Sequence, residues 1–237
     1  MCFSILKTSI GKKQIVAATG LALILFLVAH LAGNLIIFMG PEAFNGYAKK
    51  LAGLRPALNV AEAILLFIFV VHMYVTALLV LENIRARGAN QYSITASKRN
   101  QSWATRLMAY SGVYILFFVI WHLIDLTSAD HHGPRSFVIV NETTSATATT
   151  LVYKSLGLYG VVWNSFSDPV HSFLYIGAMM AIGLHLSHGV QSFLQTFGLL
   201  NQKTQPIAKR VSDLFGFIVA FGYSAIPIYV LWVNYYR

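Results

Sequence analysis

The sequence predicts an all-α integral membrane protein with five transmembrane helices. Of its 237 residues, 57% are hydrophobic and only 11% are charged, and the mean hydropathy is +0.63. A water-facing fold of this size could not bury so much apolar surface. In addition, five segments stay apolar over the roughly 20 residues that a helix needs to cross a bilayer core about 30 Å thick. We therefore interpret residues 1–237 as a single membrane domain.

Local signals support several helix ends. Gly40-Pro41 should end the first span, Ser167-Asp168-Pro169 should form the N-cap and first turn of the fourth, and Ser212-Asp213 should cap the fifth. Pro227 predicts a kink in the last span. The predicted spans lie near residues 14–39, 59–83, 104–127, 169–193 and 214–234.

Basic residues are divided unevenly between the two predicted sides of the membrane. With a cytoplasmic N-terminus, that side carries eleven of the seventeen Lys and Arg residues and two acidic ones, whereas the other side carries six of each. The positive-inside rule therefore predicts a cytoplasmic N-terminus and an outer C-terminus. This topology accounts for the net charge of +9 without nucleic acid, although a basic face could also bind anionic lipid or an acidic partner subunit. The eleven residues are Lys7, Lys12, Lys13, Arg85, Arg87, Lys98, Arg99, Arg106, Lys203, Lys209 and Arg210.

The first apolar run and the longest connection differ from the other predicted segments. The apolar run after Lys12 and Lys13 is too long for a cleavable signal peptide and lacks a small-residue cleavage site, so we interpret it as the first span. The longest connection, residues 128–167, lies on the outer side and contains a stretch rich in Ser and Thr. Residues 151–163 within it are apolar but too short to span, and we expect an interfacial or capping helix there.

The single cysteine limits the possible redox chemistry. Cys2 alone excludes an internal disulfide, a four-thiolate iron–sulfur site and a c-type haem attached through two cysteines. Any redox cofactor must therefore be held by other side chains.

Histidines occur inside four of the five predicted spans. Because an ionisable side chain at membrane depth is costly without a partner, each is a functional candidate, although a histidine hydrogen-bonded to a neighbouring helix is the ordinary alternative. At 1.5 Å per residue, His30 and His122 lie about 24 and about 27 Å from the inner face, and His72 and His185 lie about 16 and about 12 Å from it. The histidines therefore form two pairs at two depths. Each pair can supply two axial imidazoles to one haem, an arrangement that suits electron transfer.

Two glycines follow the same pattern. Gly20 of Thr19-Gly20 precedes His30 by ten residues, and Gly112 of Ser111-Gly112 precedes His122 by the same interval. The two helices run in the same direction, so both glycines fall at the depth of the other histidine pair. A residue without Cβ would let a haem approach the backbone there. Alternatively, both are ordinary small-residue contacts between transmembrane helices.

The fourth span offers a rival ligand. His188 lies about 5 Å closer to the cytoplasm than His185 and matches the depth of His72 less well, so we prefer His185. Roles for His171, at the outer end of this span, and for His131-His132 in the outer loop stay open.

The order of these elements resembles the dihaem cytochrome b anchor subunit of succinate dehydrogenase or fumarate reductase, in its five-helix, single-subunit form. The resemblance covers nearly the whole chain, and its separate pieces are weak alone but specific together. They are Ala18-Thr19-Gly20-Leu21 leading to His30-Leu31, Glu42-Ala43-Phe44-Asn45, His72, Trp121-His122, Leu184-His185-Leu186-Ser187-His188-Gly189, Ser192-Phe193 and Phe197-Gly198.

The resemblance implies a four-helix haem-binding bundle with a fifth, peripheral helix in a bacterial inner (plasma) membrane. It implies two b haems, a flavoprotein subunit and an iron–sulfur subunit on the cytoplasmic face, and a membrane quinone, usually menaquinone, as electron partner. By the family's pattern, His72 and His185 ligate the proximal haem, and His30 and His122 ligate the distal haem. The fifth helix carries no ligand in that family, and the fifth span here contains no histidine. This chain has no flavin or iron–sulfur motif, so it would not bind the dicarboxylate itself.

One departure affects the transfer of proton routes. Some family members have a glutamate two residues before the ligand in the fourth helix, whereas this chain has Gly183. Their quinone-site acid also has no clear counterpart. From depth alone, the candidates for a quinone site are Asn34, Glu62 and Asp125, each of which could equally be an interfacial polar group. Candidate partners for haem propionates are Lys13, Arg106 and Gln195.

Two other functions remain possible from the sequence. A dihaem cytochrome b of a hydrogenase or formate dehydrogenase also carries histidines in membrane helices, but its catalytic subunits usually lie outside. A transporter with a histidine proton relay is the alternative from another class, although the spans lack midplane charges and only Pro227 lies well inside one.

Overall fold

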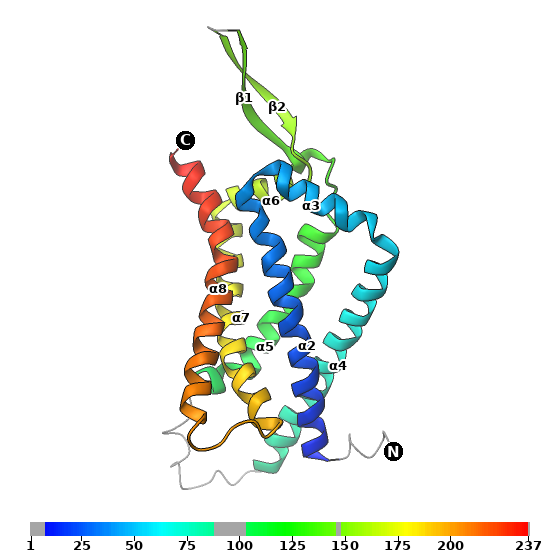
Figure 1. The fold of residues 1–237 in the computed structure, drawn as a ribbon, viewed down its shortest axis with the longest axis vertical. Coiled ribbons are helices and arrows are strands. Elements are labelled where there is room, and N and C mark those ends of the chain that lie inside the picture. Colours follow the sequence, from blue (N-terminus) through cyan, green and yellow to red (C-terminus); the bar gives the residue numbers. More distant parts are fainter. Residues whose placement is uncertain (1–7, 88–102, 146–147, 237) are drawn as a thin grey trace. The chain divides into compact units, whose positions relative to one another are not determined.

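A computed structural model describes residues 8–87, 103–145 and 148–236 (Figure 1). Its elements, in chain order, are the helix α2 (Ser9–Leu35), the 3-10 turn η1 (Ile36–Met39), the helices α3 (Pro41–Gly53), α4 (Arg55–Arg87) and α5 (Trp103–His122), the π-helical turn η3 (Leu123–Thr127), the 3-10 turn η4 (Pro134–Ser136), the strands β1 (Phe137–Ser145) and β2 (Ala148–Ser155), and the helices α6 (Gly157–Ser167), α7 (Pro169–Thr196) and α8 (Gln205–Tyr236).

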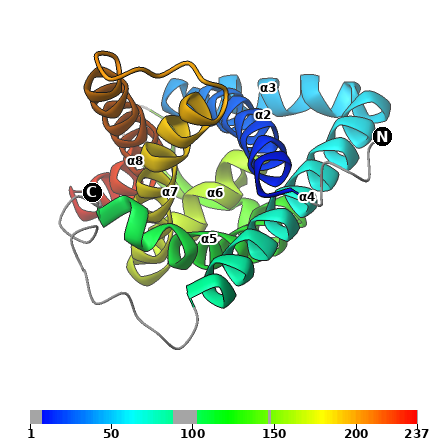
Figure 2. The same ribbon diagram turned by 90° about the horizontal axis from the view of Figure 1, so that it is seen from below.

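Five segments are long and apolar enough to cross a membrane, and their helices can be followed separately in Figure 2. The prediction of an all-α integral membrane protein with five transmembrane helices is therefore confirmed. The segments are Ser9–Met39, Arg55–Arg85, Leu107–Thr127, Pro169–Thr196 and Gln205–Tyr236.

Two predicted helix ends are confirmed in atomic detail. Gly40 follows η1 with φ +94°, a conformation that glycine adopts without steric cost, and Pro41 begins α3. Asp168 separates α6 from α7, and its Oδ1 accepts a hydrogen bond from the amide of Val170 at 2.9 Å. Both turns use residues whose backbone preferences stop one helix and start the next.

The predicted start of the last helix is wrong. Helix α8 begins at Gln205, and Ser212 lies buried inside it, where its Oγ donates to the carbonyl of Ala208 at 2.7 Å. Asn201 forms the turn before α8, since its Oδ1 accepts from the amides of Lys203 and Thr204, each at 2.9 Å. Hydropathy marks where a helix becomes apolar rather than where it begins, so the charged first turns of α8 were assigned to a loop.

The connection between α5 and α7 contains a β-hairpin that the sequence reading did not predict. Strands β1 and β2 pair antiparallel, with Phe137 opposite Ser155 and Ile139 opposite Tyr153. The expected helix over residues 151–163 is therefore wrong in its first part, because residues 151–155 belong to β2. The β-branched and aromatic residues on both strands favour pairing, and Gly157, with φ +57°, begins α6.

Helix α6 is held by α3, as Figure 1 shows where their ribbons lie side by side. The side chain of Asn45 in α3 donates from Nδ2 to the carbonyl of Leu156 at 2.7 Å and accepts at Oδ1 from the amide of Tyr159 at 3.1 Å. It thereby pairs an amide of the first turn of α6, which has no partner inside the helix. Phe44 is buried beside the ring of Tyr159, with centroids 6.4 Å apart. A helix over the later part of the predicted range is therefore confirmed, and its interfacial or capping role stays a prediction.

The chain forms two compact units. The first comprises Met1–Ala29, Pro56–Val113 and Ala181–Val219, and the second comprises His30–Arg55, Tyr114–Met180 and Ala220–Arg237. His72, His185 and both glycines of the ten-residue pattern belong to the first unit, whereas His30 and His122 belong to the second. The interpretation of residues 1–237 as one membrane domain stays a prediction.

Candidate functional site

His72 in the first unit is held by a threonine from another helix. The Oγ1 of Thr19 in α2 lies 3.0 Å from Nδ1 of His72 in α4, and it also lies 2.7 Å from the carbonyl of Ile15. A hydroxyl has one proton, and a carbonyl can only accept. The Thr19 proton therefore goes to Ile15, and Nδ1 of His72 is the donor in the other bond. Nε2 of His72 then keeps its lone pair, which is the form that binds a metal.

His185 is held in the same way by a serine. The Oγ of Ser111 in α5 lies 3.1 Å from Nδ1 of His185 in α7, and it donates to the carbonyl of Met108 at 3.1 Å. The proton of the Ser111 hydroxyl is thus used on its own helix, so His185 donates from Nδ1 and keeps the lone pair on Nε2. Both histidines of this unit consequently present the same nitrogen for a ligand bond.

The two predicted glycines lie against these imidazole rings. A Cβ on Gly20 would come within 3.3 Å of Cε1 of His72, and a Cβ on Gly112 would come within 3.6 Å of Cε1 of His185. Each glycine thus lies beside the histidine whose Nδ1 the preceding hydroxyl contacts. Their predicted role in haem packing stays a prediction.

His72 and His185 both belong to the first unit, and His188 lies three residues after His185 in the same helix. Ser111 contacts His185 as Thr19 contacts His72, and the choice of His185 over His188 as the partner of His72 stays a prediction.

His30 and His122 meet in the second unit. Their ring centroids are 6.0 Å apart and the ring planes are inclined by 81°. A metal–imidazole bond is about 2 Å long, so two imidazoles on opposite sides of one metal have centroids about 6 Å apart. The observed separation therefore fits two axial ligands of one iron. The ring of Tyr223 in α8 lies 6.1 Å from that of His30.

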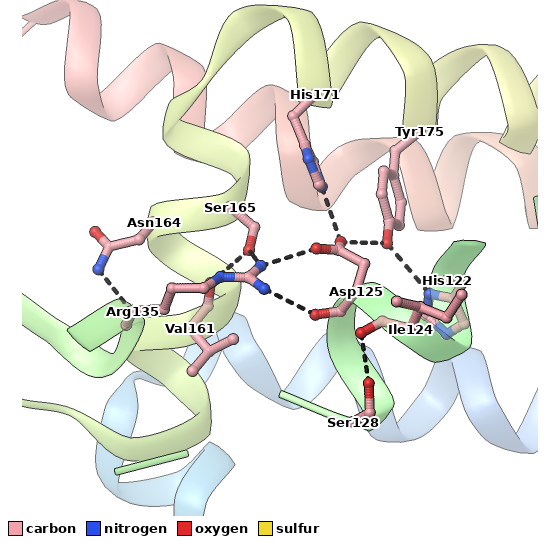
Figure 3. Close-up of polar contacts among 10 residues, drawn as sticks. All are labelled: His122, Ile124, Asp125, Ser128, Arg135, Val161, Asn164, Ser165, His171 and Tyr175. Carbon is pink, nitrogen blue, oxygen red and sulfur yellow. Dashed lines mark hydrogen bonds and ion pairs between the residues drawn. The ribbon is translucent and has the colours of Figure 1, made fainter. Parts of the chain in front are cut away.

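His122 is connected to a carboxylate through a tyrosine, as Figure 3 shows. The Oη of Tyr175 in α7 donates to Oδ2 of Asp125 at 2.8 Å, and Nδ1 of His122 lies 3.4 Å from the same Oη. Because the Tyr175 proton goes to the carboxylate, Nδ1 of His122 donates and Nε2 keeps its lone pair. Asp125 lies in the π-helical turn η3 directly after His122, and such turns often occur at functional sites.

Asp125 has further partners (Figure 3). Its side chain is only 10% exposed, and its Oδ1 accepts from Nη2 of Arg135 at 2.9 Å. Nη1 of Arg135 also donates to the Asp125 carbonyl at 3.0 Å, and Nη2 contacts Oγ of Ser165. Nε2 of His171 lies 3.1 Å from Oδ2 of Asp125, at ion-pair distance but without hydrogen-bond geometry. The carboxylate is therefore compensated by a cation and contacted by two groups that can carry protons.

Aromatic rings surround this cluster. His171 stacks on Tyr175 with centroids 4.9 Å apart, and Trp121 lies 5.2 Å from His171. Phe118 stacks on His122 at 5.7 Å, and Phe166 meets the ring of Tyr175 edge-on at 4.9 Å. Flat apolar surfaces with a few polar atoms are suited to bind a flat ring such as a quinone or a porphyrin.

The other quinone-site candidates lie elsewhere. Nδ2 of Asn34 donates to the carbonyl of His30, in its own helix, at 2.7 Å. Glu62 lies on an exposed part of α4 and belongs to the first unit, whereas Asn34 and Asp125 belong to the second. Asn34 thus contacts the backbone of a predicted ligand, whereas Asp125 is connected through Tyr175 to the imidazole ring of one, His122.

The propionate candidates are exposed where the structure describes them. Lys13 and Gln195 are exposed, and the side chain of Arg106 lies outside the described residues, as do Cys2 and Thr147. The neighbouring Lys12 is buried instead and pairs with Glu82 of α4. The sequence alone could not tell which of two adjacent lysines faces the protein.

The side chains near the predicted ligands include two buried hydroxyl groups without a hydrogen-bond partner. Buried polar groups normally have a hydrogen-bond partner, yet Thr76 Oγ1 and Ser224 Oγ have none in the structure. Thr76 lies one turn after His72, and Ser224 follows Tyr223.

Within residues 8–87, 103–145 and 148–236, no group of three or more His, Cys, Asp or Glu could hold a metal. A pair of imidazoles is instead the donor set of a haem, whose porphyrin supplies the other four ligands, and in His72, His185 and His122 the Nδ1 contact leaves the lone pair on Nε2.

Thr19, Ser111 and Tyr175 are the site residues that sequence reasoning missed. A signal was present for the first two, since a hydroxyl residue precedes each of the two matched glycines. The only signal for Tyr175 in the sequence was its position four residues after His171, on the same face of the predicted helix.

The chain has a relative among characterised proteins. It is 24% identical over 204 residues to the succinate dehydrogenase cytochrome b558 subunit of Bacillus subtilis (strain 168), and the match covers 86% of each chain. No family model matches the chain, and no solved structure gives a significant match. The match therefore extends over most of both proteins rather than over a single motif.

Proposed function

We propose that this chain is the cytochrome b subunit of a succinate dehydrogenase or fumarate reductase. In this role it transfers electrons through two b haems between a membrane quinone, menaquinone, and an iron–sulfur subunit. It also anchors that subunit and a flavoprotein subunit to the cytoplasmic face of a bacterial membrane. The observation that carries the proposal is the presence of two histidine pairs, in which three of the four histidines have Nδ1 held by a hydroxyl. The name of the Bacillus subtilis relative supports the same enzyme.

Each histidine pair has a place in this proposal. His72 and His185 would hold the proximal haem, and His30 and His122 would hold the distal haem. A haem with two axial imidazoles supplies reversible one-electron transfer without an open position for oxygen. The protein holds the ring nitrogens in place, and the apolar helices exclude water.

Asp125 is the group that exchanges protons with the quinone. Quinone chemistry requires protons as well as electrons, and a carboxylate near the distal ligands can supply and accept them. Tyr175 connects Asp125 to His122, and Arg135 holds the carboxylate in position. The aromatic rings of Trp121 and Phe166 provide flat apolar surface beside it.

The test is a haem count on the purified chain or its complex. A pyridine haemochrome assay with a reduced-minus-oxidised visible spectrum should give two low-spin b haems per chain. We expect His72→Ala or His185→Ala to remove one haem, and His30→Ala or His122→Ala to remove the other. His188→Ala is the matched control and should retain both.

Two outcomes would contradict the proposal. A well-folded preparation without haem would exclude the cytochrome function and favour a histidine-relay transporter or a simple anchor. Retention of both haems in His185→Ala with loss of one in His188→Ala would reassign the ligand. Co-purification with flavoprotein and iron–sulfur subunits that oxidise succinate would identify the enzyme. Co-purification with hydrogenase or formate dehydrogenase subunits would instead assign the chain to one of those enzymes.

A further inference from the structure

We propose that Thr19 and Ser111 are positioning residues that fix the orientation and tautomer of His72 and His185 and thereby lower the reduction potential of the haem that these histidines bind. The inference rests on the proposed function, since it concerns the same histidine pair. It adds two residues that would act on the haem through the ligands, since their hydroxyls contact the ring nitrogens of His72 and His185.

The first step of the argument is that both hydroxyls are themselves fixed. Thr19 Oγ1 donates to the carbonyl of Ile15, and Ser111 Oγ donates to the carbonyl of Met108. Each hydroxyl is therefore anchored to its own helix and can present only an acceptor lone pair to the histidine. A free hydroxyl could rotate and accommodate either tautomer, but these two accept only from an Nδ1–H group.

The second step is that a glycine completes each contact. Gly20 and Gly112 follow the two hydroxyl residues and lie against Cε1 of His72 and His185. The dipeptides Thr19-Gly20 and Ser111-Gly112 thus make the same two contacts with the rings of His72 and His185. In each, the hydroxyl lies at Nδ1 and the glycine lies beside Cε1. A single such contact could be chance packing, but two matched contacts on the two predicted ligands of one haem indicate a shared role.

The third step gives the direction of the effect. A hydrogen bond accepted from the outer N–H of a ligating histidine makes the ring a stronger electron donor to the metal. A stronger donor stabilises the ferric state more than the ferrous state, so it lowers the reduction potential. Removing either hydroxyl should therefore raise the potential of that haem.

His122 provides a contrast in the second unit. Its Nδ1 also faces a hydroxyl, but that of Tyr175 donates to the carboxylate of Asp125 rather than to a backbone carbonyl. The hydroxyls of Thr19 and Ser111 therefore act as neutral, backbone-anchored acceptors, and changing them should leave the haem of the second unit unaffected.

The experiment is a redox titration of the purified holoprotein, followed at the haem absorption bands. The decisive pair is Thr19→Ala and Thr19→Ser, which differ only by the hydroxyl. In Thr19→Ala we expect the ratio of reduced to oxidised haem at a fixed applied potential to rise about tenfold, which is about 59 mV for one electron. In Thr19→Ser the ratio should stay within about twofold of the parent value. Ser111→Ala and Ser111→Thr should behave in the same way.

The identity of the shifted haem sharpens the test. Thr19→Ala and Ser111→Ala should shift the same haem, and it should be the one that His72→Ala removes. Thr196→Ala and Ser212→Ala are matched controls, since these hydroxyls donate only to the carbonyls of Ser192 and Ala208. The controls should leave both potentials unchanged.

Several results would overturn the inference. One is an equal shift in Thr19→Ala and Thr19→Ser, which would show an effect of volume rather than of the hydroxyl. Others are shifts of different haems by the Thr19 and Ser111 variants, and no shift at all. If Thr19→Ala assembles without the haem, Thr19→Ser must still bind it at the parent potential, and its failure to do so would refute the inference. Two haems with unchanged potentials would refute this inference alone, whereas a chain without haem would refute the proposed function.

Discussion

The carboxylate of Asp125 contacts Arg135, Tyr175 and His171, and a substitution can separate its proposed proton exchange from its role in holding these side chains. Asp125→Asn keeps the size of the side chain and removes its charge. Because a positioned acid or base contributes about 10²- to 10⁴-fold to a proton-transfer step, we expect quinone turnover to fall by at least about 100-fold. Both haems should remain, since Asp125 is not a ligand. The measurement is quinone reduction by the intact complex, together with its visible spectrum.

The control for this variant is Asp213→Asn, which removes another carboxylate that pairs with a cation. Asp213 pairs with Lys209 at 2.7 Å, but both side chains are 50% exposed, and exposed pairs of this kind contribute little. Asp213→Asn should therefore retain full turnover. Full turnover in Asp125→Asn would exclude Asp125 as the proton-exchange group.

At the residue scale, the sequence marks the histidines as candidates more clearly than it marks the groups around them. His30, His72, His122 and His185 stand out because ionisable side chains are rare in apolar spans. Hydroxyl residues are ordinary in membrane helices, so nothing marked Ser111 or Thr19 apart from the glycine that follows each. The network of Asp125 depends on Arg135, which lies in the part of the long connection, before residue 151, where the sequence reading expected no helix or strand.

Gly160 controls the packing of a whole element. A Cβ at this position in α6 would lie 2.1 Å from the carbonyl oxygen of Ser136, and backbone cannot move aside as a flexible side chain can. Ser136 is fully buried and is bonded through its Oγ to Gly133 and Ser155. We therefore expect Gly160→Ala to destabilise the protein by about 1–3 kcal/mol, as overpacking usually does.

The measurement is thermal unfolding in detergent, where such a loss lowers Tm by several degrees. Gly46→Ala in α3 is the matched control, because among the described residues its added Cβ would meet no atom within 4 Å beyond its chain neighbours and the backbone of its own helix. That change should be neutral or stabilise the helix by up to about 1 kcal/mol. Equal melting temperatures for the two variants would show that α6 can shift away from Ser136.

At the element scale, the sequence predicted membrane helices well and the outer connection poorly. Five apolar runs dictate five spans, since lipid leaves the backbone no other partners. The hairpin could not be predicted in the same way, because its strands gain their order from pairing with each other and from η4 and α6. For the same reason, the polar first turns of α8 were missed, since pairs such as Lys209 and Asp213 stabilise a helix without making it apolar.

At the scale of the whole molecule, the two compact units differ both in net charge and in the histidine pair that they contain. All eleven basic residues that the sequence assigns to the cytoplasmic side belong to the first unit, together with His72 and His185. The first unit holds three acidic residues, whereas the second holds six basic and five acidic ones. This division supports the proposal that His72 and His185 bind the haem on the side of the soluble subunits.

The orientation itself gives the last prediction. If the positive-inside rule applies, a reporter fused after Arg237 lies outside the cytoplasm. We expect a C-terminal alkaline phosphatase fusion to be active and a C-terminal green fluorescent protein fusion to be dark, because the first folds only outside and the second only inside. A reporter inserted within residues 88–102 should give the opposite pattern and serves as the internal control. The reverse result at both positions would place the basic residues outside and would favour an enzyme whose catalytic subunits lie outside, such as a hydrogenase or formate dehydrogenase.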